Sequence, residues 1–312
     1  MHILLHRLII VSVLVMSPAT ASAQQDNVSA GRLDTYTKLH SEYVPTRRVQ
    51  VWLPEDYSAE RKYAVLYMHD GQMLFDATVT WNKQEWRVDE VAAELQASQQ
   101  SKPFIVVGID NGGEQRRYIE YLPQKPYQRL PLTDKQHLFM PYLAESPSNI
   151  ESIIQSDNYL KFLVTELKPF IDKTYSVHTD RAHTFIMGSS MGGLISLYAL
   201  GEYPEIFGGA GCISTHWVGG SAEQTNAITA EFMRYIAEDL PAPGSHRIYF
   251  DYGDQTLDAH YPPLQKQVDA IMQQKGFTPA QWQTLFFPGA NHSEDAWQAR
   301  LDKPLLFLLG QH

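Results

Sequence analysis

A serine in a glycine-rich turn is the strongest chemical signal in this sequence. Gly188-Ser189-Ser190-Met191-Gly192 has the pattern G-x-S-x-G, with a strand-like segment (HTFIM) before it and a helix-forming segment (LISLYAL) after it. A strand–turn–helix of this kind presents a serine hydroxyl at a sharp turn, where glycine neighbours leave the room that the turn needs. The pattern predicts Ser190 as a nucleophile and Ser189 as a residue of the turn.

A serine hydroxyl is a weak nucleophile until a base accepts its proton. Among 12 histidines, His292 is the best placed, because it lies in PGANHS, after the last expected strand and before the last expected helix. A loop there can carry the imidazole over the carboxyl end of a sheet. His260, further upstream, is the weaker candidate.

Three aspartates compete for the acid that would orient this histidine and stabilise its charged form. They lie in DYGDQTLD, at the end of an expected strand and in the loop after it. Asp251 falls within the strand, where its side chain would cap or pair. Asp254 and Asp258 both lie in the loop, and spacing alone does not separate them.

Attack on a carbonyl group creates an oxyanion, which backbone N–H groups stabilise. One donor is normally the residue after the nucleophile, here Met191, and the other comes from the loop after the third strand. The segment HDGQ, residues 69–72, occupies that loop. Gly71 would let the chain turn so that the Gln72 N–H points inward, and we expect Asp70 to fix the loop.

Short apolar segments alternate with helical ones along the chain. The expected strands are residues 49–53, 63–68, 104–109, 184–187, 248–252 and 283–287, and the expected helices are residues 160–171, 191–200, 230–236, 264–272 and 296–309. This alternation predicts an α/β protein with a mostly parallel central sheet, buried on both faces and flanked by helices.

Two segments fall outside this alternation. Residues 24–35 are polar and are expected to be a loose lead-in. Residues 115–157 are rich in Pro, Tyr, Gln and Ser, and a long irregular stretch inside a compact domain is usually a functional insertion. We therefore expect one domain with a lid-like insertion around 115–157.

The composition excludes several classes of protein. With 35 acidic and 25 basic side chains, the formal net charge is −10, which argues against nucleic acid as a partner. Cys212 is the single cysteine, so the chain has no intramolecular disulfide and no thiolate metal cluster. It falls in an expected buried strand, 207–214, where packing is a better explanation than reactivity. HExxH and similar ligand spacings are absent, so neither a metal nor an organic cofactor is expected.

The first 23 residues have the pattern of a secretory signal peptide. Arg7 supplies a positive charge, residues 8–16 a mostly apolar run, and Ala21-Ser22-Ala23 a cleavage site of small residues. The apolar run is too short to cross a bilayer as a helix. We expect cleavage to leave residues 24–312 as a single periplasmic or secreted domain without a membrane anchor.

Six motifs together resemble the putative esterase family of α/β-hydrolases. They are YMHDGQMLFD (67–76), VVGIDNG (106–112), IEYLP (119–123), GSSMGG (188–193), YFDYGDQTLDAHY (249–261) and PGANHSEDAW (288–297). The family includes esterase D, enterobactin-type siderophore esterases, feruloyl and acetylxylan esterases, and the antigen 85 mycolyltransferases. The resemblance runs from about residue 49 to residue 308 and implies the α/β-hydrolase fold and a carboxylic ester hydrolase activity.

The resemblance also implies roles for individual residues. It implies Ser190 as nucleophile, His292 as base, and the Gln72 and Met191 amides as oxyanion donors. It favours Asp258 as the acid, because similar sequences tend to carry Thr at the position of Asp254.

The substrate is less well defined by the sequence. Four aromatic residues are expected in loops at the rim of the site, where they would suit sugars or aryl groups but could equally be ordinary packing: Trp81, Trp86, Tyr121 and Trp217. Arg116, Arg117 and Glu120 could contact polar groups of a substrate or belong to a solvated loop. The preferred substrate is a small soluble ester such as an acylated sugar. The alternatives are a siderophore trilactone, acyl transfer to an alcohol, and a non-catalytic binding role.

Overall fold

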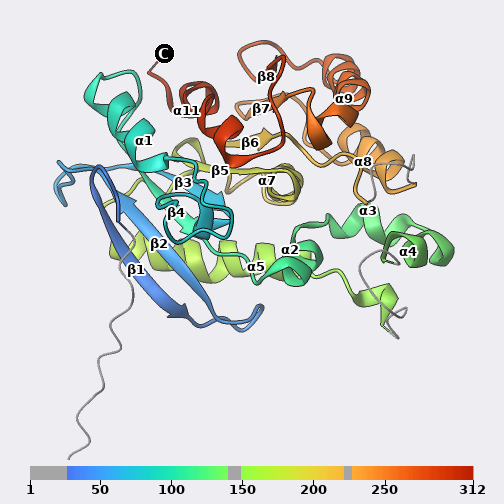
Figure 1. The fold of residues 1–312 in the computed structure, drawn as a ribbon, viewed down its shortest axis with the longest axis horizontal. Helices are drawn as coiled ribbons and strands as arrows, with labels where there is room; N and C mark the ends of the chain where they lie inside the picture. The colour runs from blue at the N-terminus through green and yellow to red at the C-terminus, as the bar shows by residue number, and fades with distance from the viewer. Residues whose placement is uncertain (1–26, 140–148, 221–226, 312) are drawn as a thin grey trace, which may run out of the picture.

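A single sheet organises the chain (Figure 1). The computed structural model describes residues 27–139, 149–220 and 227–311. Eight strands follow the order β1-β2-β4-β3-β5-β6-β7-β8. The strands β3 to β8 run parallel, whereas β2 is antiparallel to both of its neighbours. Their bounds are β1 Arg32–Leu39, β2 Arg47–Leu53, β3 Ala64–His69, β4 Phe104–Ile109, β5 Thr184–Ser189, β6 Gly209–Ile213, β7 Arg247–Tyr252 and β8 Trp282–Phe286. The predicted mostly parallel sheet is confirmed.

Helices cover both faces of this sheet because its central strands are apolar on both sides. Along β3, Leu66 and Met68 pack into one apolar cluster, which also holds residues of α1 (Val88–Ala97) and α11 (Asp302–Leu309). Val65 and Tyr67 point the other way, into a larger cluster with residues of α7 (Met191–Glu202), α8 (Ala227–Glu238) and α9 (Pro262–Gln274). Figure 1 shows α1 and α11 on one side of the sheet and α5 (Ser156–Lys161) on the other. This is the doubly covered sheet that the continuous apolar segments predict.

The helices are mostly short. Their bounds are α1 Val88–Ala97, α2 Glu114–Tyr121, α3 Gln124–Arg129, α4 Leu132–Phe139, α5 Ser156–Lys161, α6 Lys168–Thr174, α7 Met191–Glu202, α8 Ala227–Glu238, α9 Pro262–Gln274, α10 Glu294–Gln298 and α11 Asp302–Leu309. A π-helical segment, Phe162–Leu167, joins α5 to α6, and short 3-10 turns lie at Gly71–Met73, Ile150–Ser152, Arg181–His183 and Thr256–His260.

The insertion is helical rather than irregular in the part that the structure describes. The helices α2, α3 and α4 fill residues 114–139, and the prolines at 123 and 131 separate them. Buried Tyr121 and Tyr127 fix this segment to the main apolar cluster. Helices this short have too few turns to show a periodic pattern of apolar residues, so their sequence resembles that of a loop.

Three other expectations about the elements need correction. The lead-in is not loose throughout, because β1 begins at Arg32; its polar, half-exposed side chains suit an edge strand. The helix α1 was not predicted at all. The expected helix 296–309 is two helices, α10 and α11, separated by a turn at residues 299–301.

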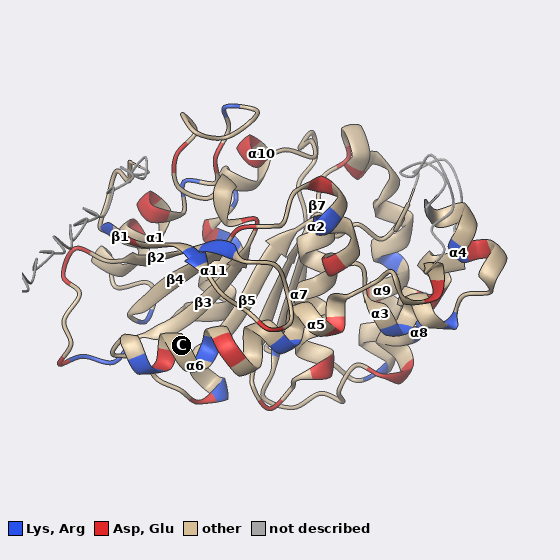
Figure 2. Cartoon of the chain, turned by 90° about the horizontal axis from the view of Figure 1, so that it is seen from below, with Lys and Arg blue, Asp and Glu red and all other residues tan. Residues whose placement is uncertain are grey.

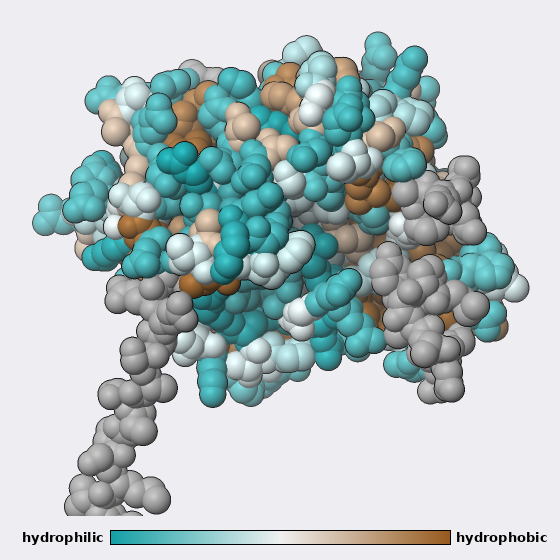
Figure 3. Space-filling view, in the orientation of Figure 1, coloured by the Kyte–Doolittle hydropathy of each residue, from teal (hydrophilic) through white to brown (hydrophobic). Residues whose placement is uncertain are grey.

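The surface is polar and mixed in charge. Acidic and basic residues are interspersed over the elements drawn in Figure 2, and hydrophilic side chains dominate the face shown in Figure 3. No helix in the described ranges combines the length and hydropathy needed to cross a bilayer. Cys212 is fully buried in β6, which confirms the predicted packing position. The predicted signal peptide, residues 1–23, lies outside the described residues.

Candidate active site

Ser190 forms the turn between β5 and α7. The strand ends at Ser189, the helix begins at Met191, and Ser190 has φ 56° and ψ −121°. A non-glycine residue at positive φ is strained and persists only where its surroundings hold it. A Cβ at Gly188 would lie 3.0 Å from backbone atoms of Gly192, so a side chain there would crowd the turn. This is the geometry of a nucleophile elbow.

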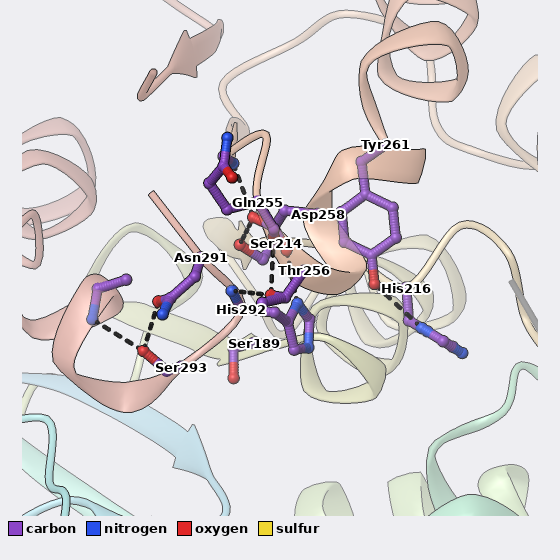
Figure 4. Close-up of polar contacts among 12 residues, drawn as sticks. Ser189, Ser214, His216, Gln255, Thr256, Asp258, Tyr261, Asn291, His292 and Ser293 are labelled. Atoms are coloured by element: carbon purple, nitrogen blue, oxygen red, sulfur yellow. Dashed lines mark hydrogen bonds and ion pairs between the residues drawn. The ribbon is translucent and has the colours of Figure 1, made fainter. Parts of the chain in front are cut away.

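Asp258 is the aspartate that lies against His292 (Figure 4). Its Oδ1 is 2.6 Å from His292 Nδ1, and its Oδ2 accepts hydrogen bonds from the Ser214 hydroxyl at 2.6 Å and the Gly253 N–H at 2.7 Å. Burial alone would raise the pKa of Asp258, but the hydrogen bond and charge of His292, with those two donors, lower it below its ordinary value. An ionised carboxylate therefore holds the imidazole at Nδ1, as a triad acid does.

The competing residues lie elsewhere. Asp254 accepts hydrogen bonds from its neighbour Gln255 and, at 2.8 Å, from the Gly289 N–H, so it contacts the backbone of the loop that carries His292. Asp251 is buried in β7 and pairs with Arg300 at 3.0 Å. His260 is exposed at the end of a 3-10 turn. Among the described residues, none of these three has a hydrogen bond to His292.

Tyr261 lies beside both Ser190 and His292. Within the described ranges no hydrogen bond links the Ser190 hydroxyl to the imidazole of His292. The ring of Tyr261 packs edge-on against His292, with centroids 5.8 Å apart, and the Ser190 side chain lowers the pKa of its hydroxyl, although burial raises that pKa more. Catalytic hydrogen bonds often form only when substrate is bound, so this arrangement is compatible with a triad.

The loop after β3 presents backbone N–H groups. Asp70 has φ 57°, a 3-10 turn starts at Gly71, and a Cβ at Gly71 would lie 2.7 Å from a backbone nitrogen of β4. The loop therefore lies directly on β4. In the part of the chain that the structure describes, the Gln72 and Met191 N–H groups donate to no protein acceptor. Both remain available to an oxyanion.

Arg117 fastens this loop to α2. Its guanidinium donates to both carboxylate oxygens of Asp70 at 2.8 Å, and Asn111 donates to the same carboxylate at 2.6 Å. Burial favours a raised pKa for Asp70, yet Arg117 and Asn111 reverse the shift and lower it. Arg117 also reaches the Ser189 carbonyl at 3.4 Å. The insertion thus contacts both the loop after β3 and the elbow.

Most of the aromatic residues proposed for the rim are in the core. Trp86, Tyr121 and Trp217 are 3%, 0% and 1% exposed, so their rings serve packing and are not presented to a substrate. Trp81 is 82% exposed and is the one of the four that a substrate could touch. Glu120 is likewise internal, because it forms a buried bidentate pair with Arg47 at 2.9 Å.

A polar cavity of about 440 Å³ lies between the first turn of α2 and the residues that precede α5. It begins just after Asn111, whose N–H donates to the Gln72 side chain at 3.2 Å. Its lining is Gly112, Gly113, Glu114, Gln115, Arg116, Ile119, Asn149, Ile153 and Gln155. Exposed glycine backbone and a guanidinium suit a polar ligand better than a hydrocarbon chain.

One group of side chains in the described ranges could hold a metal ion. The ligand atoms of His178, Asp180 and His183 lie within 4.8 Å of one another. They precede β5 and so lie at the opposite end of that strand from the elbow. The two imidazoles stack with centroids 4.0 Å apart and planes at 21°, so their lone pairs run side by side rather than toward one ion. We assign no metal to this group.

Several neighbours of the site escaped the sequence analysis. Ser214 and His216 follow β6, and Tyr261 follows the turn that carries Asp258. The only sequence signal for them was their position after strands of a parallel sheet, where side chains gather at the carboxyl edge.

The fold and the site together define an α/β-hydrolase with a serine elbow, a histidine–aspartate pair and free N–H donors. The family model described as "Putative esterase" matches residues 42–308. The chain therefore belongs to the putative esterase family, and it is a carboxylic ester hydrolase by class.

Relatives support the same fold at low sequence identity. The uncharacterized protein YbbA of Bacillus subtilis is 24% identical over 276 residues, covering 85% of this chain and 94% of that protein. A ferulic acid esterase structure matches with TM-score 0.61 and 20% identity over 89% of this chain and 98% of its own. The enterobactin esterase of Shigella flexneri matches with TM-score 0.62 and 18% identity; 91% of this chain is covered but only 60% of that enzyme.

Proposed function

We propose that this protein is an exported serine esterase that hydrolyses a small, polar carboxylic ester through Ser190, His292 and Asp258. The observation that carries the proposal is the 2.6 Å contact between His292 Nδ1 and Asp258, in a chain whose Ser190 occupies a strained elbow. Asp254, the other candidate acid, accepts a hydrogen bond from the backbone N–H of Gly289 instead.

In the proposed mechanism, His292 accepts the Ser190 proton through Nε2 while Oγ attacks the ester carbonyl. The Gln72 and Met191 N–H groups stabilise the oxyanion, and His292 then protonates the departing alcohol. Water hydrolyses the acyl-enzyme by the same route in reverse. Each oxyanion donor of this type is worth about 2.7–4 kcal/mol.

Two features support a polar substrate. The cavity of about 440 Å³ is lined by backbone and polar side chains, and Trp81 offers one exposed ring. An acylated sugar fits both, since sugars combine hydroxyl groups with faces that stack on aromatic rings. A trilactone ester of the siderophore type, or transfer of the acyl group to an alcohol, is the alternative outcome.

Activity is tested with p-nitrophenyl acetate, using the wild type and Ser190→Ala. We expect hydrolysis by the wild type and a rate at background for the variant; equal rates would reject the serine esterase. A panel of acetylated and feruloylated sugars and siderophore trilactones then identifies the class of ester. Turnover of the trilactones alone would reverse the preference for sugars, and ester formation with added alcohol would indicate an acyltransferase.

Export is a separate part of the proposal. It is tested by expressing the full chain in a bacterial host and measuring the mass of the protein recovered from the periplasm or medium. A product that begins at Gln24 supports it. Full-length protein retained in the cytoplasm would contradict it.

A further inference from the structure

Two buried side chains beside the elbow have no part in the mechanism above. Tyr261 is fully buried, and its hydroxyl lies 3.1 Å from Nδ1 of His216 (Figure 4). The Ser190 side chain lowers the pKa of the same hydroxyl against the larger effect of burial, and the Tyr261 ring packs against His292. Tyr261 is thus adjacent to both the expected nucleophile and the expected base.

The backbone fixes both residues relative to these catalytic groups. The Tyr261 N–H donates to the carbonyl of Asp258 at 2.9 Å, so the tyrosine is tied to the residue that orients His292. The N–H of His216 donates to the Ser190 carbonyl at 3.2 Å, which ties the second residue to the elbow. Backbone hydrogen bonds therefore attach Tyr261 to the expected acid and His216 to the expected nucleophile.

We propose that Tyr261 is a further catalytic residue, whose hydroxyl donates a hydrogen bond to Ser190 Oγ whenever this oxygen gains negative charge, and that His216 is the positioning residue that orients it. This inference rests on the proposed role of Ser190 as the nucleophile.

The number of protons that His216, Tyr261 and Ser190 carry determines the direction of the hydrogen bonds between them. Burial, followed by the charges of His292 and Arg117, lowers the pKa of His216 to about 3, so its imidazole is neutral and carries one proton. Burial raises the pKa of Tyr261 above its ordinary value, so the phenol keeps its proton. Once Ser190 has lost its proton to His292, Oγ is an acceptor only. The arrangement that satisfies all three groups is His216 Nδ1–H to Tyr261, and Tyr261 O–H to Oγ.

The hydrogen bond acts where charge develops on Oγ. During acylation, Oγ loses its proton to His292 as its bond to the carbonyl carbon forms. During deacylation, water adds to the acyl carbon and gives its proton to His292. The carbon–Oγ bond then breaks, its electron pair stays on Oγ, and His292 returns the proton to that oxygen. Tyr261 keeps its own proton throughout and supplies a donor at both moments.

The test replaces the hydroxyl alone, by Tyr261→Phe, and measures two rates. One is kcat on p-nitrophenyl acetate, and the other is the rate at which a fluorophosphonate probe labels Ser190, which needs no knowledge of the natural substrate. We expect both rates to fall about 10- to 100-fold, as for a lost hydrogen bond to a charged oxygen, with KM changed less than threefold. The melting temperature is recorded to show that the variant is folded.

Tyr63→Phe is the matched control. Tyr63 is also fully buried, and its hydroxyl accepts a hydrogen bond from the Ser58 N–H at 2.9 Å. It precedes β3 and so lies away from the carboxyl edge of the sheet. We expect this variant to keep both rates within twofold.

The role of His216 is tested by a double-mutant cycle. His216→Asn should lower kcat by itself but should have little further effect in a protein that already carries Tyr261→Phe, because it acts through that hydroxyl. Additive losses would overturn the positioning role. If the wild type hydrolyses the ester and Ser190→Ala does not, while Tyr261→Phe keeps more than half of both rates, only this inference fails. If the wild type is neither active nor labelled at Ser190, the proposed function itself fails.

Discussion

Replacing Asp258 by asparagine changes one buried atom in the proposed triad. The Oδ2 position is surrounded by donors, the Ser214 hydroxyl and the Gly253 N–H, so the asparagine amide oxygen is expected to occupy it. The new NH₂ group then faces His292 Nδ1, which must become an acceptor. The imidazole proton is forced to Nε2, and no lone pair remains there to accept the Ser190 proton.

The size of the effect follows from the charge that is lost. Two unit charges about 4 Å apart attract by about 4 kcal/mol at an effective dielectric constant of 20. Asp258 is fully buried and His292 has only 14% of its side chain exposed, so solvent screens the pair weakly. At 1.36 kcal/mol per factor of ten, loss of this stabilisation of the imidazolium lowers kcat by about 1000-fold.

The assay is kcat and KM on p-nitrophenyl acetate for Asp258→Asn, with Asp254→Asn as the matched control. The control changes a carboxylate four residues away that accepts hydrogen bonds from the Gly289 N–H and from Gln255. An asparagine amide oxygen can accept the same hydrogen bonds, so we expect the kcat of this variant to stay within threefold of the wild type. Two results would contradict this role of Asp258. One is an Asp258→Asn enzyme that keeps more than a tenth of its kcat, and the other is an equal loss in both variants.

Three further predictions concern the surroundings of the site. Arg117→Ala leaves the carboxylate of Asp70 largely buried and unpaired, which should cost about 2–3 kcal/mol of unfolding free energy in urea titrations and lower kcat at least tenfold; unchanged values would show that the loop does not need the pair. Gly71→Ala places a methyl group 2.7 Å from a backbone nitrogen of β4, and we expect kcat to fall at least tenfold while Ser190 labelling persists. Burial lowers the pKa of both His69 and His216 to about 3, so between pH 6.5 and pH 3 only the unfolded chain takes up these two protons. Urea titrations should therefore show an unfolding free energy about 4 kcal/mol lower at pH 5 than at pH 7 from these two histidines. The variant His69→Gln should remove about half of this difference.

The elbow was predictable because all its determinants are local. Glycines within three residues of Ser190 make the turn possible, and an apolar strand and helix flank it directly. The parallel sheet was predictable for a similar reason, since β3, β4 and β5 are apolar on both faces and β1 is not. The sequence missed β1 because its side chains are mostly polar, and its place at the edge is set by pairing with β2 rather than by burial.

The features that could not be predicted correctly from the sequence depend on contacts between residues that are far apart along the chain. Arg117 meets Asp70 across 47 positions, and no periodicity marks that pair. Trp86 and Trp217 were expected at the rim because they flank predicted loops, yet each is buried under neighbouring elements. A large aromatic residue beside a loop is consistent with either location, and only the packing of the whole chain decides between them.

The choice between Asp254 and Asp258 shows why spacing could not identify the acid. After β7 the chain reverses at Thr256, which has φ 53°, and enters a 3-10 turn. This turn directs Asp258 inward to His292, whereas Asp254, before the reversal, faces the Gly289 N–H of the histidine loop. Both aspartates therefore contact the loop that carries His292, one at the imidazole and the other at the backbone. Asp254 is best explained as a residue that holds this loop in place through the Gly289 N–H.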